Sequence, residues 1–225
     1  MKYNNYKWYL NRFKSMSFKE YFYRFNQKIN NIYNKSFHSG LYPQNVPYTF
    51  ENINLDNINH EKRSAFTKNI NIFGKSLDFS MNSDWHKDIF NNKTFPNKYG
   101  KDINIRSDEL GNAKFVWEIN RLQFLPSILF EYISTDDKKY LNLFMEILES
   151  WKTSNPYLIG INWHSNIEVN LRLISWFWCW SILDIKKEMK SNNVFKEFVD
   201  KTWIPLIYMH CKYSYNNPSK FSSAN

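Results

Sequence analysis

Cysteine is scarce in this 225-residue chain, which contains only Cys179 and Cys211. Neither residue belongs to a C-x-x-C pair or to another spacing typical of metal ligands. The two cysteines therefore do not indicate a metal site, and we predict that both are free, buried thiols.

Long apolar segments are also missing. Residues 1–21 contain no apolar core like that of a secretory signal peptide. The longest apolar run, from about Leu173 to Leu183, is too short to cross roughly 30 Å of hydrocarbon. We therefore predict no export signal, no membrane anchor and no membrane partner, with the cytoplasm as the default location.

Acidic residues are outnumbered, because 30 Lys and Arg face 21 Asp and Glu and give a formal net charge of +9. The basic residues are spread along the chain, which favours a broad positive field toward an anionic partner, although solubility alone also explains it. No groove-reading motif accompanies them, so we do not expect nucleic acid as a partner.

The chain does have ample material for a core, since 43% of its residues are hydrophobic and 19% are aromatic. This composition and length suit one continuous globular domain. We divide it into two parts. Residues 1–112 are predicted to form a helix, ordered loops and a small hairpin that wrap the rest, and residues 113–225 to form helical hairpins.

Two local signals stand out in the first part. Ser17 to Glu20 matches a capping box and predicts a helix that continues to about Tyr33. Residues 70–79, INIFGKSLDF, alternate apolar and polar around Gly74 and Lys75, as expected of a small β-hairpin. The remaining Asn- and Pro-containing stretches indicate ordered loop.

The second part is strongly helical in pattern. The four expected helices cover about residues 115–133, 136–153, 165–185 and 194–213. Ser134 and Thr135 are expected to cap the second helix, a capping box at Ser165 and Glu168 to open the third, and Pro205 to bend the fourth. Short connections between such helices require antiparallel packing, so the predicted fold class is all-α.

The third helix has a single polar stripe. Glu168, Arg172, Ser175 and Cys179 share one face, while apolar and aromatic residues cover the rest. We predict a helix that is buried almost all round, with the stripe facing a cleft or another polar stripe, because an unpaired buried charge costs several kcal/mol. An internal Glu168–Arg172 ion pair is the alternative.

Residue types suited to a carbohydrate site occur near the beginnings of two of these helices. If the two beginnings meet at one rim, Trp and Asn or Gln side chains supply stacking surfaces and amide donors, and Arg121 supplies a clamp for a carboxylate or sulfate. The predicted substrate-binding residues are Trp117, Glu118, Asn120, Arg121, Gln123, Asn162, Trp163 and His164. Burial of Trp163 in the core and a structural role for His164 remain the alternatives.

Several blocks of the chain resemble one known family. These blocks are KYGKDINIR (98–106), GNAKFVWEINRLQFL (111–125), ESWKTSNPYLIGINWHSNIEVNLRLISW (149–176) and SSAN (222–225). Together they resemble the N-terminal region of heparinase II/III-like polysaccharide lyases, and the opening YLNRFKSMSFKEYFYR resembles the start of those chains. The combination of W-E-x-N-R with G-I-N-W-x-S-x-x-E-V is its most specific part.

The resemblance implies an (α/α) toroid of antiparallel helical hairpins, incomplete in this chain. In the family, further toroid helices and a C-terminal β-sandwich domain follow, with the catalytic cleft between toroid and sandwich. Family members cleave uronic-acid polysaccharides by β-elimination, in which a base removes the C5 proton and the C4–O bond breaks. The enzyme must neutralise the uronate carboxylate and the charge that develops on it. We expect an anionic polysaccharide partner, and no cofactor or metal.

The resemblance also implies where the catalytic groups lie. In the family a segment like SSAN continues into an Asn-His pair, so Asn225 is expected at or next to the catalytic asparagine. A tyrosine and a histidine that handle the proton are expected further along the chain. We therefore expect residues 1–225 to bind polysaccharide without cleaving it, and we interpret His210 and Tyr213 as a packed pair.

Two other functions stay open from the residues alone. A glycosidase on a similar toroid would use Glu118 and Glu168 as acid and base. A non-catalytic glycan-binding module would bind saccharide and show no activity in any context.

Overall fold

The computed structural model describes residues 5–49, 69–78, 84–107 and 109–221. Most of them are helical, as the all-α prediction requires, with two small antiparallel strand pairs. Within these ranges no helix has the length and apolarity needed to cross a bilayer. Both cysteines are free, but only Cys179 is buried and Cys211 is exposed, which corrects the expectation for Cys211.

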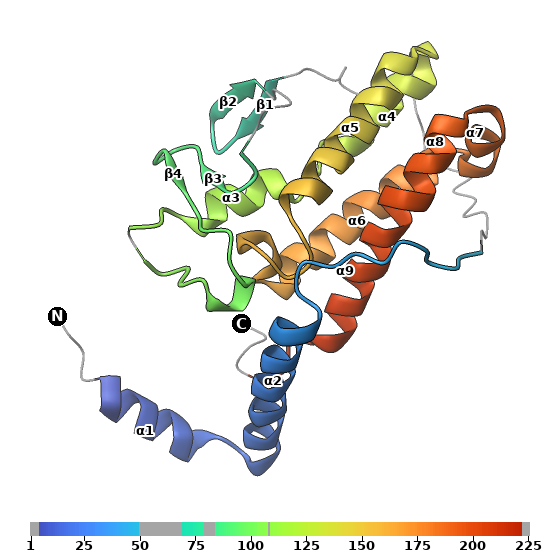
Figure 1. Ribbon diagram of the computed structural model, residues 1–225. Helices are drawn as coiled ribbons and strands as arrows, with labels where there is room; N and C mark the ends of the chain where they lie inside the picture. Colours follow the sequence, from blue (N-terminus) through green and yellow to red (C-terminus); the bar gives the residue numbers. More distant parts are fainter. Residues whose placement is uncertain (1–4, 50–68, 79–83, 108, 222–225) are drawn as a thin grey trace.

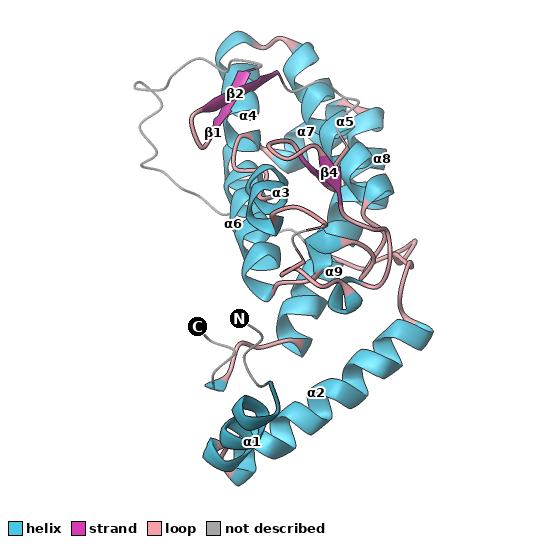
Figure 2. Ribbon diagram, turned by 90° about the vertical axis from the view of Figure 1, so that its left-hand side faces the viewer, coloured by secondary structure: helices cyan, strands magenta, loops and turns pink. Residues whose placement is uncertain are grey.

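The chain begins with two helices, α1 (Asn5–Ser15) and α2 (Phe18–Phe37), that extend beyond the main body (Figures 1 and 2). Ser17 caps α2 as predicted, because its side chain accepts a hydrogen bond from the Glu20 amide at 3.2 Å. The Glu20 carboxylate binds Arg12 and Arg24.

The predicted hairpin is present as β1 (Asn69–Ile72) and β2 (Lys75–Asp78), paired with Asn69 opposite Asp78. Phe73 and Gly74 form its turn, and both have positive φ. A second, unpredicted pair joins β3 (Lys87–Asp88) to β4 (Lys93–Thr94). Both pairs lie near α3 (Ala113–Asn120) in Figure 1.

The body consists of antiparallel helices. Its elements are α4 (Leu125–Thr135), α5 (Lys138–Ser154), α6 (Asn166–Ile182), α7 (Ile185–Ser191), α8 (Asn193–Phe198), a π-helical turn (Val199–Trp203) and α9 (Ile204–Asn216). Helix α4 packs on α5 and α6, and α6 packs on α9. The described residues thus form helical hairpins, and the toroid remains a proposal.

The first expected helix of the body, 115–133, is in fact two helices, α3 and α4. Leu122 lies in the break with φ of 56° and is fully buried. Pro126, in the first turn of α4, has no N–H to bond the carbonyl four residues earlier, which belongs to Leu122. A continuous helix would therefore lose a hydrogen bond at this point, and the break lets α3 leave the line of α4.

Other boundaries also differ from the prediction. Asp137 caps α5 in place of Ser134 or Thr135, because its carboxylate reaches the Lys139 amide at 3.0 Å. Helix α7 was not predicted. The fourth expected helix, 194–213, corresponds to α8, the π-helical turn and α9, and Pro205 lies in the first turn of α9.

One core joins the helices to the loops before them. It contains Trp151, Trp163, Trp176 and Trp203, each no more than 1% exposed. Trp85 and Tyr99, which precede residue 113, belong to the same core. This shared core is compatible with the proposed continuous domain of residues 1–112 and 113–225.

Candidate functional site

Three segments meet at the end of the body where α6 begins. The segments are residues 98–102, α3 and residues 158–164. The Gly100 amide bonds the Leu158 carbonyl and the Gly160 amide bonds the Lys98 carbonyl, both at 2.8 Å. A Cβ at Gly100 would lie 2.8 Å from the Gly160 carbonyl oxygen, so only glycine permits this approach.

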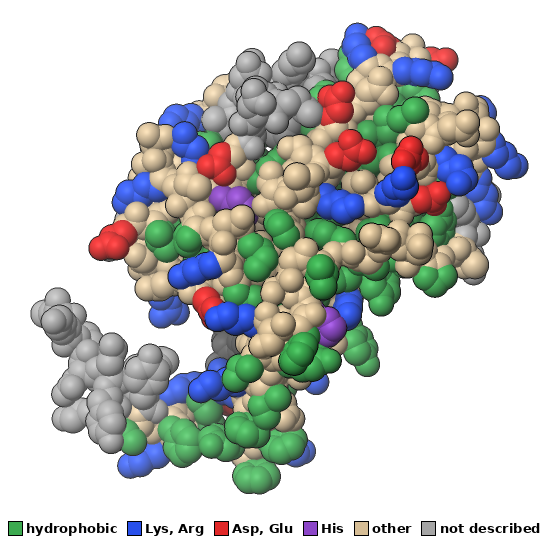
Figure 3. Space-filling model, in the orientation of Figure 1, with side chains coloured by type: hydrophobic (Ala, Val, Ile, Leu, Met, Phe, Trp, Pro, Cys, Tyr) green, Lys and Arg blue, Asp and Glu red, His purple; other side chains and the backbone are tan. Residues whose placement is uncertain are grey.

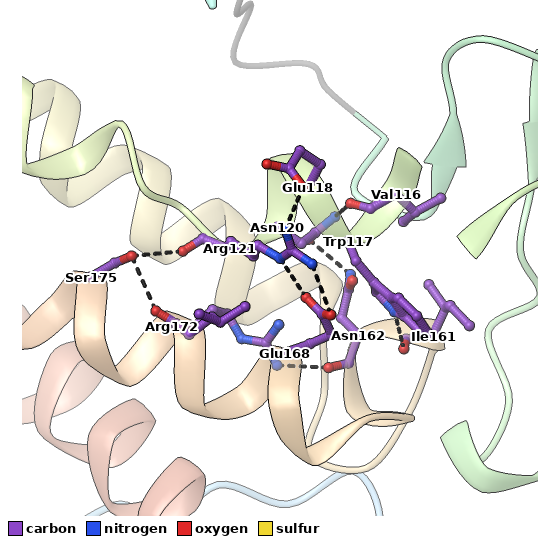
Figure 4. Close-up of polar contacts among 11 residues, drawn as sticks. Val116, Trp117, Glu118, Asn120, Arg121, Ile161, Asn162, Glu168, Arg172 and Ser175 are labelled. Atoms are coloured by element: carbon purple, nitrogen blue, oxygen red, sulfur yellow. Dashed lines mark hydrogen bonds and ion pairs between the residues drawn. The ribbon is translucent and has the colours of Figure 1, made fainter. Parts of the chain in front are cut away.

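Arg121 joins α3 to α6. Its Nε and Nη2 bind both oxygens of Glu168 at 2.8 and 3.1 Å, and its Nη1 binds Glu118 (Figure 4). Its carbonyl accepts a hydrogen bond from the Ser175 hydroxyl at 2.9 Å. The guanidinium that we predicted as a clamp for substrate is therefore already occupied by two carboxylates.

Glu168 has a different role from the predicted cap. Ser165 precedes α6 but makes no side-chain capping bond. The carboxylate of Glu168 is turned toward α3, where Arg121 provides a bidentate, charge-assisted partner that a cap could not match. The alternative Glu168–Arg172 pair is not formed, because Arg172 donates to His210 and to the Asn162 carbonyl.

Asn120 and Asn162 lie in a buried amide network. The Asn162 Nδ2 lies 2.8 Å from the Asn120 Oδ1 and 2.8 Å from the Asn155 Oδ1. The Asn120 amide donates to the Trp85 carbonyl at 2.9 Å, and its oxygen accepts from the Trp151 ring nitrogen at 2.8 Å. Both asparagines are at most 1% exposed, so in this structure they hold loops together and do not reach a substrate.

Trp163 is likewise part of the core, with 1% exposure. Its indole nitrogen donates to the Asn155 carbonyl at 3.2 Å, and its carbonyl accepts from the Tyr213 hydroxyl at 2.7 Å. The ring packs 4.5 Å from that of His210. The stacking platform predicted at Trp163 is therefore replaced by core packing, and His210 and Tyr213 are packed as interpreted from the sequence.

Trp117 and His164 form the accessible aromatic part of the site. Their rings are stacked, with centroids 6.3 Å apart, and both residues are partly exposed. The Trp117 ring nitrogen donates to the Ile161 carbonyl at 3.0 Å, and the His164 Nδ1 donates to the Gly100 carbonyl at 2.9 Å. Burial of His164, with a contribution from Lys101, lowers its pKa, so the ring is neutral at neutral pH.

Lys101 is a partly exposed cation that the sequence reading did not select. Its ammonium donates to the His164 carbonyl at 2.6 Å and lies 5.6 Å from the centre of the Tyr213 ring. Burial lowers the pKa of Lys101 to about 8. The signal available in the sequence was its place after Gly100 in the block KYGKDINIR.

The structure thus brings the two predicted segments together, but it buries some of their predicted binding residues and leaves others partly exposed. We call Lys101, Trp117, Glu118 and His164 the rim, and Gln123 lies exposed in the break between α3 and α4. Asn225 lies outside the described residues. Within the described ranges, no group of three or more His, Cys, Asp or Glu is placed to hold a metal ion.

The class of protein follows from this arrangement together with the sequence comparison. The described chain is a helical domain with an aromatic and basic rim at one end of its hairpins. The family model described as Heparinase II/III N-terminus matches residues 22–219, so the chain belongs to this family. No curated protein and no solved structure matches it.

Proposed function

We propose that this chain is the N-terminal helical part of a polysaccharide lyase that acts on a uronic-acid-containing, anionic polysaccharide by β-elimination. Membership of the heparinase II/III family supports the lyase class. The rim supports the substrate class, because it combines stacked, partly exposed rings at Trp117 and His164 with the ammonium of Lys101.

Lys101 is the proposed contact for a uronate carboxylate. An ammonium group has three donors, and the His164 carbonyl occupies one of them. In a partly buried position its charge acts through a lower effective dielectric than at the open surface. Arg121 is not available for this task, because its N–H groups bind Glu168 on one edge of the guanidinium and Glu118 on another.

The uncharged part of the sugar is proposed to lie against Trp117. The ring is held by its bond to the Ile161 carbonyl and by its stacking on His164, so little side-chain freedom is lost on binding. The Glu118 carboxylate, 26% exposed, and the Gln123 amide are proposed to bond sugar hydroxyls.

The glycosidase alternative receives less support. Both carboxylates that it needs, Glu118 and Glu168, bind the same guanidinium, and Glu168 is only 4% exposed. This arrangement favours a role for Glu168 in joining helices. A glycan-binding module without activity would share the rim, and an activity assay of the full-length protein distinguishes it.

Binding by the chain is tested with a panel of glycosaminoglycans, alginate and bacterial exopolysaccharides, and with a neutral glucan as reference. We expect Lys101→Gln to weaken binding of the recognised anionic polymer about tenfold or more, because a charge-assisted hydrogen bond is lost. Lys186→Gln, on the exposed surface of α7 at the other end of α6, is the matched control and should leave affinity unchanged.

The pH dependence gives a second readout of the same contact. Lys101 loses its proton as the pH rises through about 8, so the affinity of the parent chain should fall over that range. The Lys101→Gln protein should show no such fall. Equal pH profiles for the two proteins would remove Lys101 from the proposed site.

Activity is tested on the full-length protein that carries this chain. Products with the ultraviolet absorbance of an unsaturated uronate are expected from the polymer that binds. Saturated products would indicate hydrolysis, and binding without any product would indicate a non-catalytic module.

A further inference from the structure

Helix α2 presents its polar face to the rest of the protein and its apolar face to solvent. Glu20 is buried and binds Arg12 at 2.5 Å and Arg24 at 3.0 Å, and the Tyr23 hydroxyl donates to the Pro218 carbonyl. On the opposite face the exposed fractions lie between 48% and 85% for Phe18, Tyr21, Phe22, Phe25, Ile29, Ile32 and Tyr33. This orientation is the reverse of that of a helix that covers a core.

The apolar face continues onto α1. Leu10 and Phe13 are 41% and 59% exposed, and the Phe13 ring meets that of Tyr21 edge-on at 5.4 Å. Figure 3 shows hydrophobic side chains gathered at this end of the molecule, over the two helices that project from the body in Figures 1 and 2. We call Leu10, Phe13 and the seven α2 residues above the α1–α2 apolar surface.

Basic residues flank this surface on both sides. With 100° per residue, Lys19 lies along one edge of the α2 stripe and Lys28 along the other, and both are exposed. Lys14 follows in the last turn of α1. Glu20 is the only acidic residue in 5–37, and it is buried against the two arginines.

We propose that the α1–α2 apolar surface lies on an anionic phospholipid bilayer. Helices that lie in the plane of a bilayer combine a one-sided aromatic and aliphatic face with flanking Lys and Arg. Phe and Ile side chains enter the boundary between headgroups and acyl chains, and Tyr hydroxyls and Lys ammonium groups remain among the headgroups.

Charge complementarity favours lipid over a second copy of the chain as the occupant. Two copies packed through the α1–α2 apolar surface would bring Lys19 and Lys28 near basic or neutral residues, since α2 exposes no acidic side chain to pair with them. An anionic bilayer supplies the missing negative charge. The expectation of no membrane partner rested on the absence of a spanning segment, and a helix lying in the interface does not need one.

The test is co-sedimentation of the protein with vesicles of phosphatidylcholine alone or with phosphatidylglycerol added. We expect stronger binding to the anionic vesicles, decreasing with added salt. Each lysine near an anionic surface strengthens binding about fivefold, so Lys19→Glu with Lys28→Glu should weaken it about 30-fold or more. Phe22→Gln with Phe25→Gln should reduce binding to both vesicle types at least about tenfold.

Phe177→Gln is the matched control, because Phe177 is 44% exposed on α6 and outside the α1–α2 apolar surface. It should bind vesicles like the parent protein. Circular dichroism checks the fold of each variant, and the lysine variant with the salt series decides the outcome if the Phe variant does not fold. Equal binding to both vesicle types, no binding, or a dimer that Phe22→Gln with Phe25→Gln dissociates would overturn the proposal.

Discussion

His210 shows how much of this core depends on single polar side chains. It is completely buried, accepts a hydrogen bond from the Arg172 Nε at 2.9 Å, and donates from Nδ1 to the Leu206 carbonyl at 2.8 Å. Burial and the nearby charge of Arg172 hold its pKa well below the usual range. Its neutral ring is therefore the acceptor that the buried guanidinium requires.

This arrangement predicts a loss of stability in mild acid. Below about pH 6.5 the unfolded chain protonates His210 while the folded protein does not, so the free energy of unfolding falls by up to about 1.4 kcal/mol per pH unit. His210→Gln, which keeps an acceptor for Arg172, should show a shallower fall between pH 7 and pH 5 in urea unfolding.

The test compares the pH dependence of the free energy of unfolding between the parent protein and His210→Gln. His164 also has a lowered pKa, from burial first, and contributes a dependence of the same sign to both. Parallel stability curves for the parent and the variant would contradict the assignment of the acid dependence to His210.

At the scale of elements, the tie between α3 and α6 determines the shape of the site. The break before Pro126 frees α3 from the line of α4, and Arg121 then reaches Glu168 on α6. Helix α6 has its polar stripe buried and its apolar face exposed at Ile167, Ile174, Phe177 and Trp178. The prediction of a helix buried almost all round was therefore wrong for that face, although burial of the stripe against other polar groups was right.

A double-mutant cycle measures the tie. We expect Arg121→Met to lower the free energy of unfolding by about 3 kcal/mol, because it leaves the buried Glu168 carboxylate without its partner. Combining it with Glu168→Gln should recover part of the loss, with a coupling energy of about 1 to 3 kcal/mol.

Glu118→Gln is the control for this cycle. Glu118 binds the same guanidinium but is 26% exposed, so its replacement should change stability by no more than about 1 kcal/mol. Additive single-variant effects at Arg121 and Glu168 would show that the pair does not hold α3 against α6.

At the scale of the whole molecule, the net charge of +9 gives the protein a positive field toward an anionic polymer. Screening shortens the range of this field from about 10 Å at 0.1 M salt to about 3 Å at 1 M. Affinity for the recognised anionic polysaccharide should therefore fall about tenfold or more between 0.05 and 0.5 M sodium chloride.

Titration calorimetry at several salt concentrations checks this expectation. A neutral glucan is the reference, and its affinity should not change with salt. If affinity for the anionic polymer did not change with salt, the net charge would not contribute to binding, and only short-range contacts at the rim would remain to explain it.

The sequence by itself determined the local features and the family. The Ser17 cap, the hairpin at residues 69–78 and the helical character of the chain after residue 113 follow from neighbours within a few positions, where hydrogen bonding and periodicity act directly. The break between α3 and α4 and the separate helix α7 did not follow from them. The blocks W-E-x-N-R and G-I-N-W carry the family resemblance, which the family match confirms. The meeting of the two segments was a condition of the predicted rim, and the structure fulfils it.

Only the tertiary structure decided which of those residues reach solvent. Asn120, Asn162 and Trp163 are residue types that also bind sugars at protein surfaces. In this protein, contacts with Trp85, Asn155 and Tyr213 bury them. Lys101 became part of the rim through the close approach of Gly100 to Gly160. Burial is set by chain segments distant in sequence, so no local pattern distinguishes a polar group that binds a ligand from one that binds the protein itself.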